Sequence, residues 1–367
     1  MATVGRQSWT ANRRPTDERG GGDVQELLGR IAKLDPEASL GLRVIACFDE
    51  LMAGEVNSHA LASAAAALAG CPAGFRSGDG SRRLRVDSGG VSIPGDRPAE
   101  VAALSLPNDS EVWLEREDGA LPNDELILER FGLAIGVRFG LERQQLETPR
   151  DVAVALDPAA TPEDRSAAAV RLGLTPGSGY RVLAAPLFAV FEKRPAGPTD
   201  VITSEHGTLQ VVIVTDDTED IAVTPAGLGP SGSIGELPRS LRAAVVALRL
   251  SRPPEEGLVR SENFGGLVEL LAESSDTTDP DAALIDEIMD SPWAESTVRV
   301  LLEAPTIRQA ARDLGLHHST VQSRAEQIER CLGYDPLSGY NRTRLGISVL
   351  RWRLRNSRVL ELPGPVG

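Results

Sequence analysis

Residues 306–328, TIRQAARDLGLHHSTVQSRAEQI, constrain the fold of this chain more than any other segment. Two alanines at 310–311 allow a close helix crossing, and a glycine between two leucines at 314–316 supplies a tight turn. A valine at 321 and an isoleucine at 328 then recur at i and i+7 on the inward side of a second helix. Small residues, a turn glycine and inward apolar residues in this order predict two helices that cross at roughly 90–120°, a helix-turn-helix.

The second of these helices is expected to begin with polar side chains that face outward. A helix N-terminus offers free N–H groups to phosphate and directs side chains toward base edges. Gln322 has the groups to pair with adenine, and Arg324 those to pair with guanine or a phosphate. A hairpin of two helices that packs only against protein is the alternative interpretation. The predicted DNA-contacting residues are His317, His318, Ser319, Thr320, Gln322, Ser323 and Arg324.

The charge of the chain is unevenly distributed. The formal net charge is −15, which by itself disfavours nucleic acid. From residue 291 onward there are 11 Arg and 7 Asp or Glu, a net charge of +4, whereas residues 1–290 carry −19. Because attraction to phosphate depends on local charge, the basic C-terminal part is the expected DNA-binding part.

Composition also disfavours membrane-spanning, disulfide-stabilised and metal-dependent proteins. No apolar run reaches the roughly 18 residues needed to span a bilayer, and no hydrophobic segment follows the basic start, so we expect a cytoplasmic protein without a membrane partner. The cysteines Cys47, Cys71 and Cys331 form no CxxC pair, which is typical of a reducing compartment. None of the four histidines has zinc-ligand spacing, so no metal and no cofactor are expected.

Hydrophobic periodicity divides the chain into three domains. Residues 23–147 alternate helical and strand-like segments, an α+β layout. Strand and helix patterns alternate in residues 165–271, which predicts an α/β sandwich. Its helix at 237–250 carries apolar residues on more than one face, from which we expect this domain to contribute to dimerisation. Residues 281–360 are helical throughout. We expect a linker with a short helical piece at 148–164, a second linker at 272–280, a disordered tail at 1–22 and a second tail at 361–367.

Individual elements follow from the same patterns. The expected strands are at 84–86, 91–93, 112–114, 180–190, 209–214 and 221–223, and the expected helices before the third domain are at 27–34, 41–54, 59–69, 123–143, 166–174 and 237–250. In the third domain we expect helices at 281–289, 294–304, 307–314, 319–328 and 345–360, with a loop at 333–344.

The C-terminal segment 297–360 resembles the helix-turn-helix domain of PucR/CdaR-type bacterial regulators. The resemblance rests on residues 310–311, 314–317, 320–321, 324, 328, 332–333 and the terminal Arg- and Leu-rich helix. Residues 165–271 resemble the degenerate GGDEF-like domain of such regulators through AAAVRLGL, YRVLAAP, LRAAVVALRL and ENFGGLVELLA. The block from about residue 40 resembles a GAF-like sensor through AAAALAGCPAGFR, EVWLER and LILERFGLAIGVR.

This resemblance implies a homo-oligomeric, sequence-specific regulator of transcription that binds double-stranded DNA. Its fold is then multidomain α+β: a GAF-like α+β sensor, a degenerate GGDEF-like α/β sandwich and an all-α helix-turn-helix domain. RNA polymerase and a small-molecule effector are further partners that it allows. The chain departs from the family pattern in the recognition helix, where residues 318–319, 322–324 and 326–327 are less basic.

Two other functional classes stay open. The reduced charge of the recognition helix favours a protein-interaction scaffold whose helix-turn-helix no longer contacts DNA. The middle domain allows a nucleotide-handling enzyme, but Gly265–Gly266 is followed by Leu-Val, which is not the Gly-Gly-Asp/Glu-Glu-Phe turn of an active GGDEF domain. We therefore expect no enzyme activity.

Overall fold

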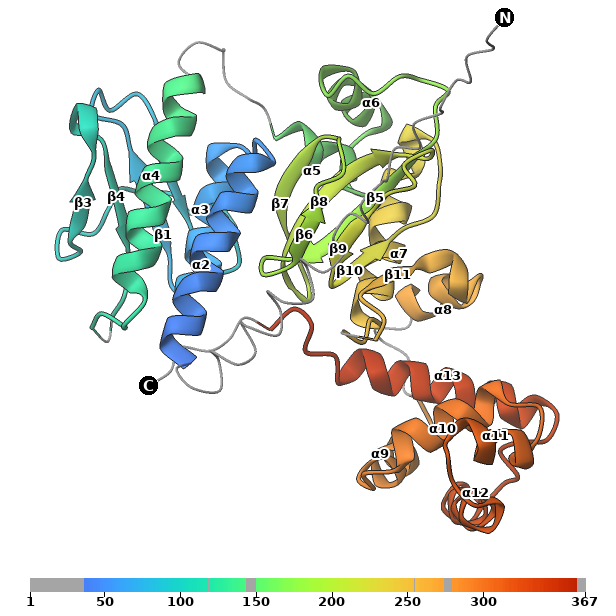
Figure 1. The fold of residues 1–367 in the computed structure, drawn as a ribbon. Helices are drawn as coiled ribbons and strands as arrows, with labels where there is room; N and C mark the ends of the chain where they lie inside the picture. The colour runs from blue at the N-terminus through green and yellow to red at the C-terminus, as the bar shows by residue number, and fades with distance from the viewer. Residues whose placement is uncertain (1–35, 118, 143–149, 254, 274–278, 362–367) are drawn as a thin grey trace, which may run out of the picture.

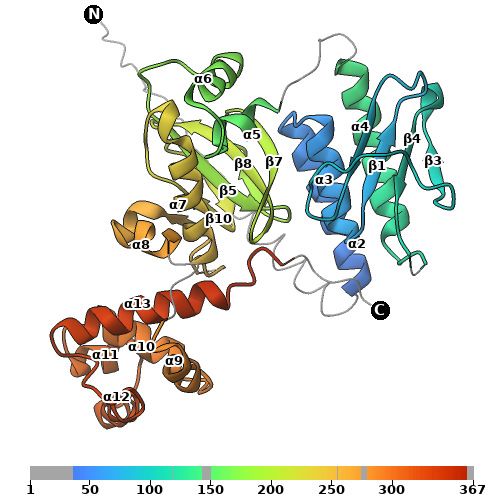
Figure 2. The ribbon, with the colours of Figure 1, turned by 180° about the vertical axis from the view of Figure 1, so that it is seen from behind.

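The computed structural model describes residues 36–361 except 118, 143–149, 254 and 274–278. It shows an N-terminal part, a central part and a C-terminal helical part (Figures 1 and 2). The tail expected at 1–22, the helix expected at 27–34 and most of the tail expected at 361–367 lie outside the described residues. Within the described ranges, no helix is long and apolar enough to cross a membrane.

The N-terminal part is an antiparallel sheet with helices on one face. Its helices are α2 (Pro36–Ala53), α3 (Ser58–Ala69) and α4 (Asp124–Glu142), as the periodicity predicts. Its strands are in the order β2-β1-β4-β3. The segment expected as a strand at 91–93 makes only one bridge, between Val86 and Ser92. The strands are β1 (Ala73–Arg76), β2 (Arg83–Val86), β3 (Ala103–Ser105) and β4 (Glu111–Leu114).

Helix α3 is buried on almost every side. It packs against α4 and β1 within the N-terminal part and against a strand of the central part. A helix that is apolar all round is stable only inside protein, and its run of alanines lets the neighbours approach closely. Asn57 caps its start by accepting a hydrogen bond from the Ala60 N–H. The core around α3 also contains Leu187 and Val201, so the first two parts share one core.

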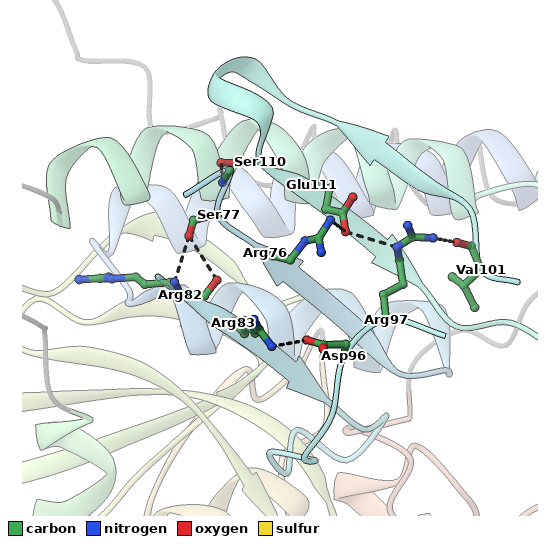
Figure 3. A network of polar contacts seen from close by, with 10 residues as sticks. Arg76, Ser77, Arg82, Arg83, Asp96, Arg97, Val101, Ser110 and Glu111 are labelled. Atoms are coloured by element: carbon green, nitrogen blue, oxygen red, sulfur yellow. Dashed lines mark hydrogen bonds and ion pairs between the residues drawn. The ribbon is translucent and has the colours of Figure 1, made fainter. Parts of the chain in front are cut away.

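The opposite face of this sheet is polar (Figure 3). Glu111 on β4 forms ion pairs with Arg76 at 3.0 Å and with Arg97 at 3.4 Å. Arg83 bonds Asp96 at 2.8 Å, and both side chains are mostly exposed. An exposed pair such as Arg83–Asp96 contributes about 0–1 kcal/mol, so it adds little stability.

The central part is a five-stranded sheet in the order β11-β10-β5-β8-β7. Every pairing is antiparallel except β10 with β11. The hairpin between β7 and β8 turns within two residues, which only antiparallel strands allow, so the predicted α/β sandwich is a largely antiparallel α+β arrangement. The strands are β5 (Tyr180–Pro186), β7 (Thr199–Ser204), β8 (Gly207–Thr215), β10 (Ala226–Leu228) and β11 (Leu258–Arg260).

Alternate residues of this sheet face two different cores. On one face, α5 (Asp151–Leu156) and α7 (Leu237–Arg249) pack against the even positions of β5, with α6 (Pro162–Arg171) beside α5. On the other face, β6 (Val190–Lys193) and β9 (Ala222–Thr224) cover the odd positions. The strand expected at 180–190 is therefore two strands, which separate at Leu187.

The linker predicted at 148–164 contains its expected short helical piece, and this piece packs into the central part. The described part of residues 148–164 contains α5 and the start of α6, and Val152, Ala155 and Leu156 are buried in the core of the central part. Asp151 at the start of α5 accepts a hydrogen bond from Arg171 of α6 at 2.6 Å. Of the prolines that suggested a linker, Pro158 follows the end of α5 and Pro162 is the first residue of α6, where proline is tolerated.

The second apolar face of α7 is covered within the chain. Ala244 and Leu248 face the sheet. Val246 and Leu250 contact α8 (Leu267–Glu273) and the C-terminal helix α13 (Tyr340–Arg355). The extra apolar residues of α7 are thus explained by contacts inside one chain, and they are not evidence for dimerisation.

The C-terminal part is all helical, as predicted. Its last helix, α13, begins inside the predicted loop at 333–344 and extends to the central part (Figures 1 and 2). Leu345 and Val349 belong to the core of the C-terminal part, and Leu350 and Leu354 pack with α7 and α8. One continuous helix therefore connects the two cores. The other helices are α9 (Ala282–Met289), α10 (Ala294–Glu303), α11 (Ile307–Asp313) and α12 (His318–Leu332).

Candidate nucleic-acid interface

The α11–turn–α12 unit has the geometry that the sequence predicts. Thr306 caps α11, its hydroxyl accepting a hydrogen bond from the Gln309 N–H at 3.1 Å. Gly315 has φ +63°, a left-handed conformation that glycine adopts at little cost, and it redirects the chain into α12. Ala310, Val321 and Ile328 are buried together in the core of the C-terminal part. This packing fixes the two helices of the motif relative to each other.

Helix α12 starts at His318, one residue earlier than expected, and ends at Leu332, four residues later. His317 caps it: Nδ1 accepts a hydrogen bond from the Ser319 N–H at 3.3 Å and lies 2.7 Å from the Ser319 hydroxyl. Because Nδ1 is the acceptor, Nε2 carries the ring proton and is the nitrogen left to donate to another molecule. A histidine thus takes the capping role that Ser, Thr, Asp or Asn usually has.

Most of the predicted contact residues are at the exposed end of α12. His317, His318, Ser319, Thr320 and Ser323 are all exposed, and they occupy the cap and the first turn and a half of the helix. Gln322 is half-buried and donates a hydrogen bond to Glu326 at 3.0 Å. The structure therefore brings together a polar surface of hydroxyls and imidazoles with little charge.

Arg324 lies elsewhere. Its guanidinium donates a hydrogen bond to the hydroxyl of Thr297 at 2.9 Å and is 5.0 Å from the centre of the Trp293 ring. Thr297 is fully buried on α10. Position 324 is three residues after the buried Val321, so its long side chain lies beside the apolar stripe of α12 and reaches α10. The Arg324 side chain therefore holds α12 against α10, and its contact with DNA stays a prediction.

Residues 296–350 match the PucR C-terminal helix-turn-helix domain. The chain carries a PucR-type helix-turn-helix domain. The matched span runs from α10 into α13 and includes the capped start of α12. A domain of this type indicates a DNA-binding regulator of transcription.

Other comparisons add little to this result. The regulator of polyketide synthase expression from Bifidobacterium adolescentis is 15% identical and aligns over 56% of this chain and 97% of its own, with a TM-score of 0.23. That score is too low to support an inference about fold or function. Among curated proteins, none matches this chain.

The PucR-type domain also presents two arginines that the sequence reasoning missed. Arg308 and Arg312 are exposed on α11, and Arg312 donates a hydrogen bond to Gln309 at 2.5 Å. The first helix of a DNA-binding helix-turn-helix crosses the phosphate backbone, so its exposed cations are natural phosphate contacts. Their spacing of four residues on one helix face is the signal that could have identified them.

A buried carboxylate attaches α13 to the rest of the PucR-type domain. Asp281 accepts hydrogen bonds from Arg344 at 2.5 and 2.6 Å and from the Tyr334 hydroxyl at 3.2 Å. The hydrogen bonds from Arg344 lower the pKa of Asp281, although burial opposes this. Burial together with the charge of Asp281 raises the pKa of Tyr334 to about 12. This contact holds together the start of α9, the loop after α12, and α13.

Proposed function

We propose that the protein is a sequence-specific, non-enzymatic regulator of transcription that inserts the first turns of α12 into the major groove of DNA. The exposed and capped N-terminal end of α12 is the observation that carries this proposal. In DNA-binding helix-turn-helix proteins this end of the second helix approaches the base edges. The hydroxyls of Ser319, Thr320 and Ser323 and the Nε2–H of His317 supply the donors and acceptors that base edges require.

Phosphate contacts come from the neighbouring helix α11 in this proposal. Arg308 and Arg312 are the exposed cations closest in sequence to the turn. With two such contacts per domain, the slope of log K against log salt is about −2 for each bound domain. Affinity for random DNA is correspondingly low, because the remainder of the chain is strongly acidic.

A salt titration of duplex binding tests the proposal. We expect Arg308→Ala and Arg312→Ala each to make the slope shallower by about one per bound domain. Arg330→Ala is the matched control, since Arg330 is exposed near the far end of α12 and should leave the slope unchanged. If selection from a random pool of duplexes yields none that binds the chain in a salt-dependent way, DNA binding is refuted.

That negative outcome would support the second candidate function, a protein-interaction scaffold. Two observations favour it: Gln322 bonds Glu326 on its own helix, and Arg324 bonds Thr297 within the domain. Both side chains that the sequence assigned to base readout therefore have intramolecular partners.

We further propose that two copies bind paired half-sites, because one helix-turn-helix reads too few base pairs for useful specificity. Light scattering of the full chain with a selected duplex is expected to give two copies per duplex, and a stoichiometry of one would contradict this. In the same proposal the N-terminal part has a GAF-like sensing role and the central part is a GGDEF-like connecting module. RNA polymerase is a candidate partner, and a DNA-binding role places the protein in the cytoplasm.

A test of the sensing role must respect the shared core around α3. Deletion of residues 1–147 would expose Leu187 and Val201, which pack in that core, and would damage the central part directly. Surface substitutions of the N-terminal part that leave this core intact are the better perturbation. If such substitutions never alter DNA affinity, the sensing role is wrong.

A further inference from the structure

The joint between the N-terminal and central parts contains a buried carboxylate. Asp200 on β7 is only 1% exposed. Its Oδ1 accepts hydrogen bonds from the Asn57 side-chain amide at 3.2 Å and from the Val201 N–H at 2.8 Å. Its Oδ2 is buried and has no hydrogen-bond partner among the described residues. One oxygen of a carboxylate at the contact of two parts is thus unsatisfied.

Protonation of Asp200 does not remove this deficit. A charged Oδ2 requires a donor, and a protonated Oδ2 requires an acceptor, and the described side chains supply neither. An unsatisfied buried polar group costs about 1–3 kcal/mol, and more when the group is charged. Such a group in a native protein calls for a partner beyond the described residues, and water or a ligand can fill that role.

The space beside Asp200 has the chemistry of a cation site. A cavity of about 200 Å³ is lined by residues from three segments, the turn before α3, the α5–α6 pair and the start of β7. Among the described residues that line it, the charged ones are Glu55 and Asp200, and both are acidic. Val152, Leu172 and Pro198 provide apolar wall. The cavity therefore combines two carboxylates with a small apolar surface.

We infer that this cavity binds a small primary ammonium compound with a short alkyl chain. Its ammonium group donates a hydrogen bond to Oδ2 of Asp200 and is attracted by the exposed carboxylate of Glu55, while its alkyl chain contacts Val152 and Leu172. A bare divalent ion fits less well, because two carboxylates leave most of its six or more positions unfilled. In the described part of the chain, no group of three His, Cys, Asp or Glu is placed to hold a metal.

The position of the cavity gives this binding a structural consequence. Its walls come from both sides of the joint, Gly54 to Asn57 on one side and β7 on the other. A ligand held there adds contacts between the two parts and stabilises their present arrangement. The proposed site lies at this joint, so a test of ligand binding there does not depend on whether α12 binds DNA.

Charge around Asp200 determines how binding depends on pH. Burial raises the pKa of Asp200 to about 6, while the nearby charge of Arg150 partly opposes the rise. Glu55 also lines the cavity, the Arg194 guanidinium lies against Gly54 of its wall and is paired with Glu50, and the residue paired with Asp200 on β8 is the apolar Val211. An ammonium ion binds the ionised carboxylate, so affinity should increase between about pH 5 and pH 7 and then level off.

Calorimetric titration of the full chain with n-propylammonium chloride tests the inference, with sodium chloride at equal ionic strength as the reference. We expect one bound molecule per chain at pH 7.5. Asp200→Asn should weaken binding at least tenfold, and Glu55→Gln should weaken it less. Glu163→Gln is the matched control, because Glu163 is an exposed carboxylate on α6 outside this cavity. 1-Propanol, which has the same shape without the charge, should not bind.

Three results would overturn the inference. They are absence of binding by the unmodified chain up to high millimolar ligand, equal affinity in Asp200→Asn, and equal affinity for 1-propanol. In the first case water alone occupies the cavity. Because Asp200→Asn can disturb the joint, Glu55→Gln and the pH series are independent measurements on a folded chain. Affinity that is flat between pH 5 and pH 7 would also exclude Asp200 as the binding group.

Discussion

Arg324 offers the sharpest test of how the recognition helix is held. Replacement by alanine removes a charged hydrogen bond to the buried Thr297 hydroxyl and a contact with the Trp293 ring. A hydrogen bond to a charged group contributes about 1.5–3 kcal/mol, and a partly exposed cation–π contact about 0.5–1 kcal/mol. The two share one side chain and do not add fully, so we expect Arg324→Ala to destabilise the α10–α12 contact by about 2 kcal/mol.

Hydrogen exchange on the full chain measures this effect locally, without a two-state assumption for a chain with several cores. A loss of about 2 kcal/mol should accelerate exchange of the buried amides in α10 and α12 roughly 30-fold. Arg330→Ala is the matched control on the same helix and should stay within about 0.5 kcal/mol. Arg324→Lys should restore only part of the protection, since an ammonium lacks the planar fork of the guanidinium.

A double-mutant cycle with Thr297→Val separates the hydrogen bond from the packing of the arginine stem. Our assignment requires a coupling energy between the two positions and exchange rates that change without DNA present. Unchanged protection in Arg324→Ala, combined with a loss of affinity for one selected duplex, would show that Arg324 reads DNA and refute the positioning role.

Three further outcomes follow from the geometry. His317→Ala removes the cap of α12 and should cost about 0.5–2 kcal/mol, seen as faster exchange in its first turn, whereas His317→Asn should retain most of the protection. The lowered pKa of Asp281 stabilises the fold above the ordinary aspartate pKa near 4, and this stability is lost as pH falls through the lower folded value. Thermal unfolding from pH 7 down to pH 2 should therefore show a smaller loss on acidification in Arg344→Gln than in the unmodified chain; an equal loss would contradict the linkage. Gly227→Ala would place a methyl group 2.0 Å from the Ala244 carbonyl oxygen, so α7 must move off β10 at a cost of about 1–3 kcal/mol or more, measurable as a lower midpoint of thermal unfolding of the central part.

Local patterns in the sequence were sufficient to predict much of the PucR-type domain. The turn glycine at 315 and the inward Val321 depend on neighbours within a few residues, so the chain encodes them directly. The run of alanines in α3 likewise predicts a helix from local composition alone. These are the features that the structure confirms.

Tertiary structure decided the features that depend on distant partners. The sequence places Arg324 near the start of the second helix, but the hydrogen bond from its guanidinium to Thr297 depends on the packing of α10, which no local pattern predicts. In the sequence, residues 151–156 are a short helical piece within a predicted linker. In the structure they are buried, because β7 and α7 provide the surface against which they pack. Asp200 is an ordinary strand residue in the sequence, and it becomes a buried carboxylate only when α3 of another part closes over it. Short-range hydrogen bonds and turn preferences are properties of a segment, whereas burial and side-chain partners are properties of whatever the rest of the chain brings beside it.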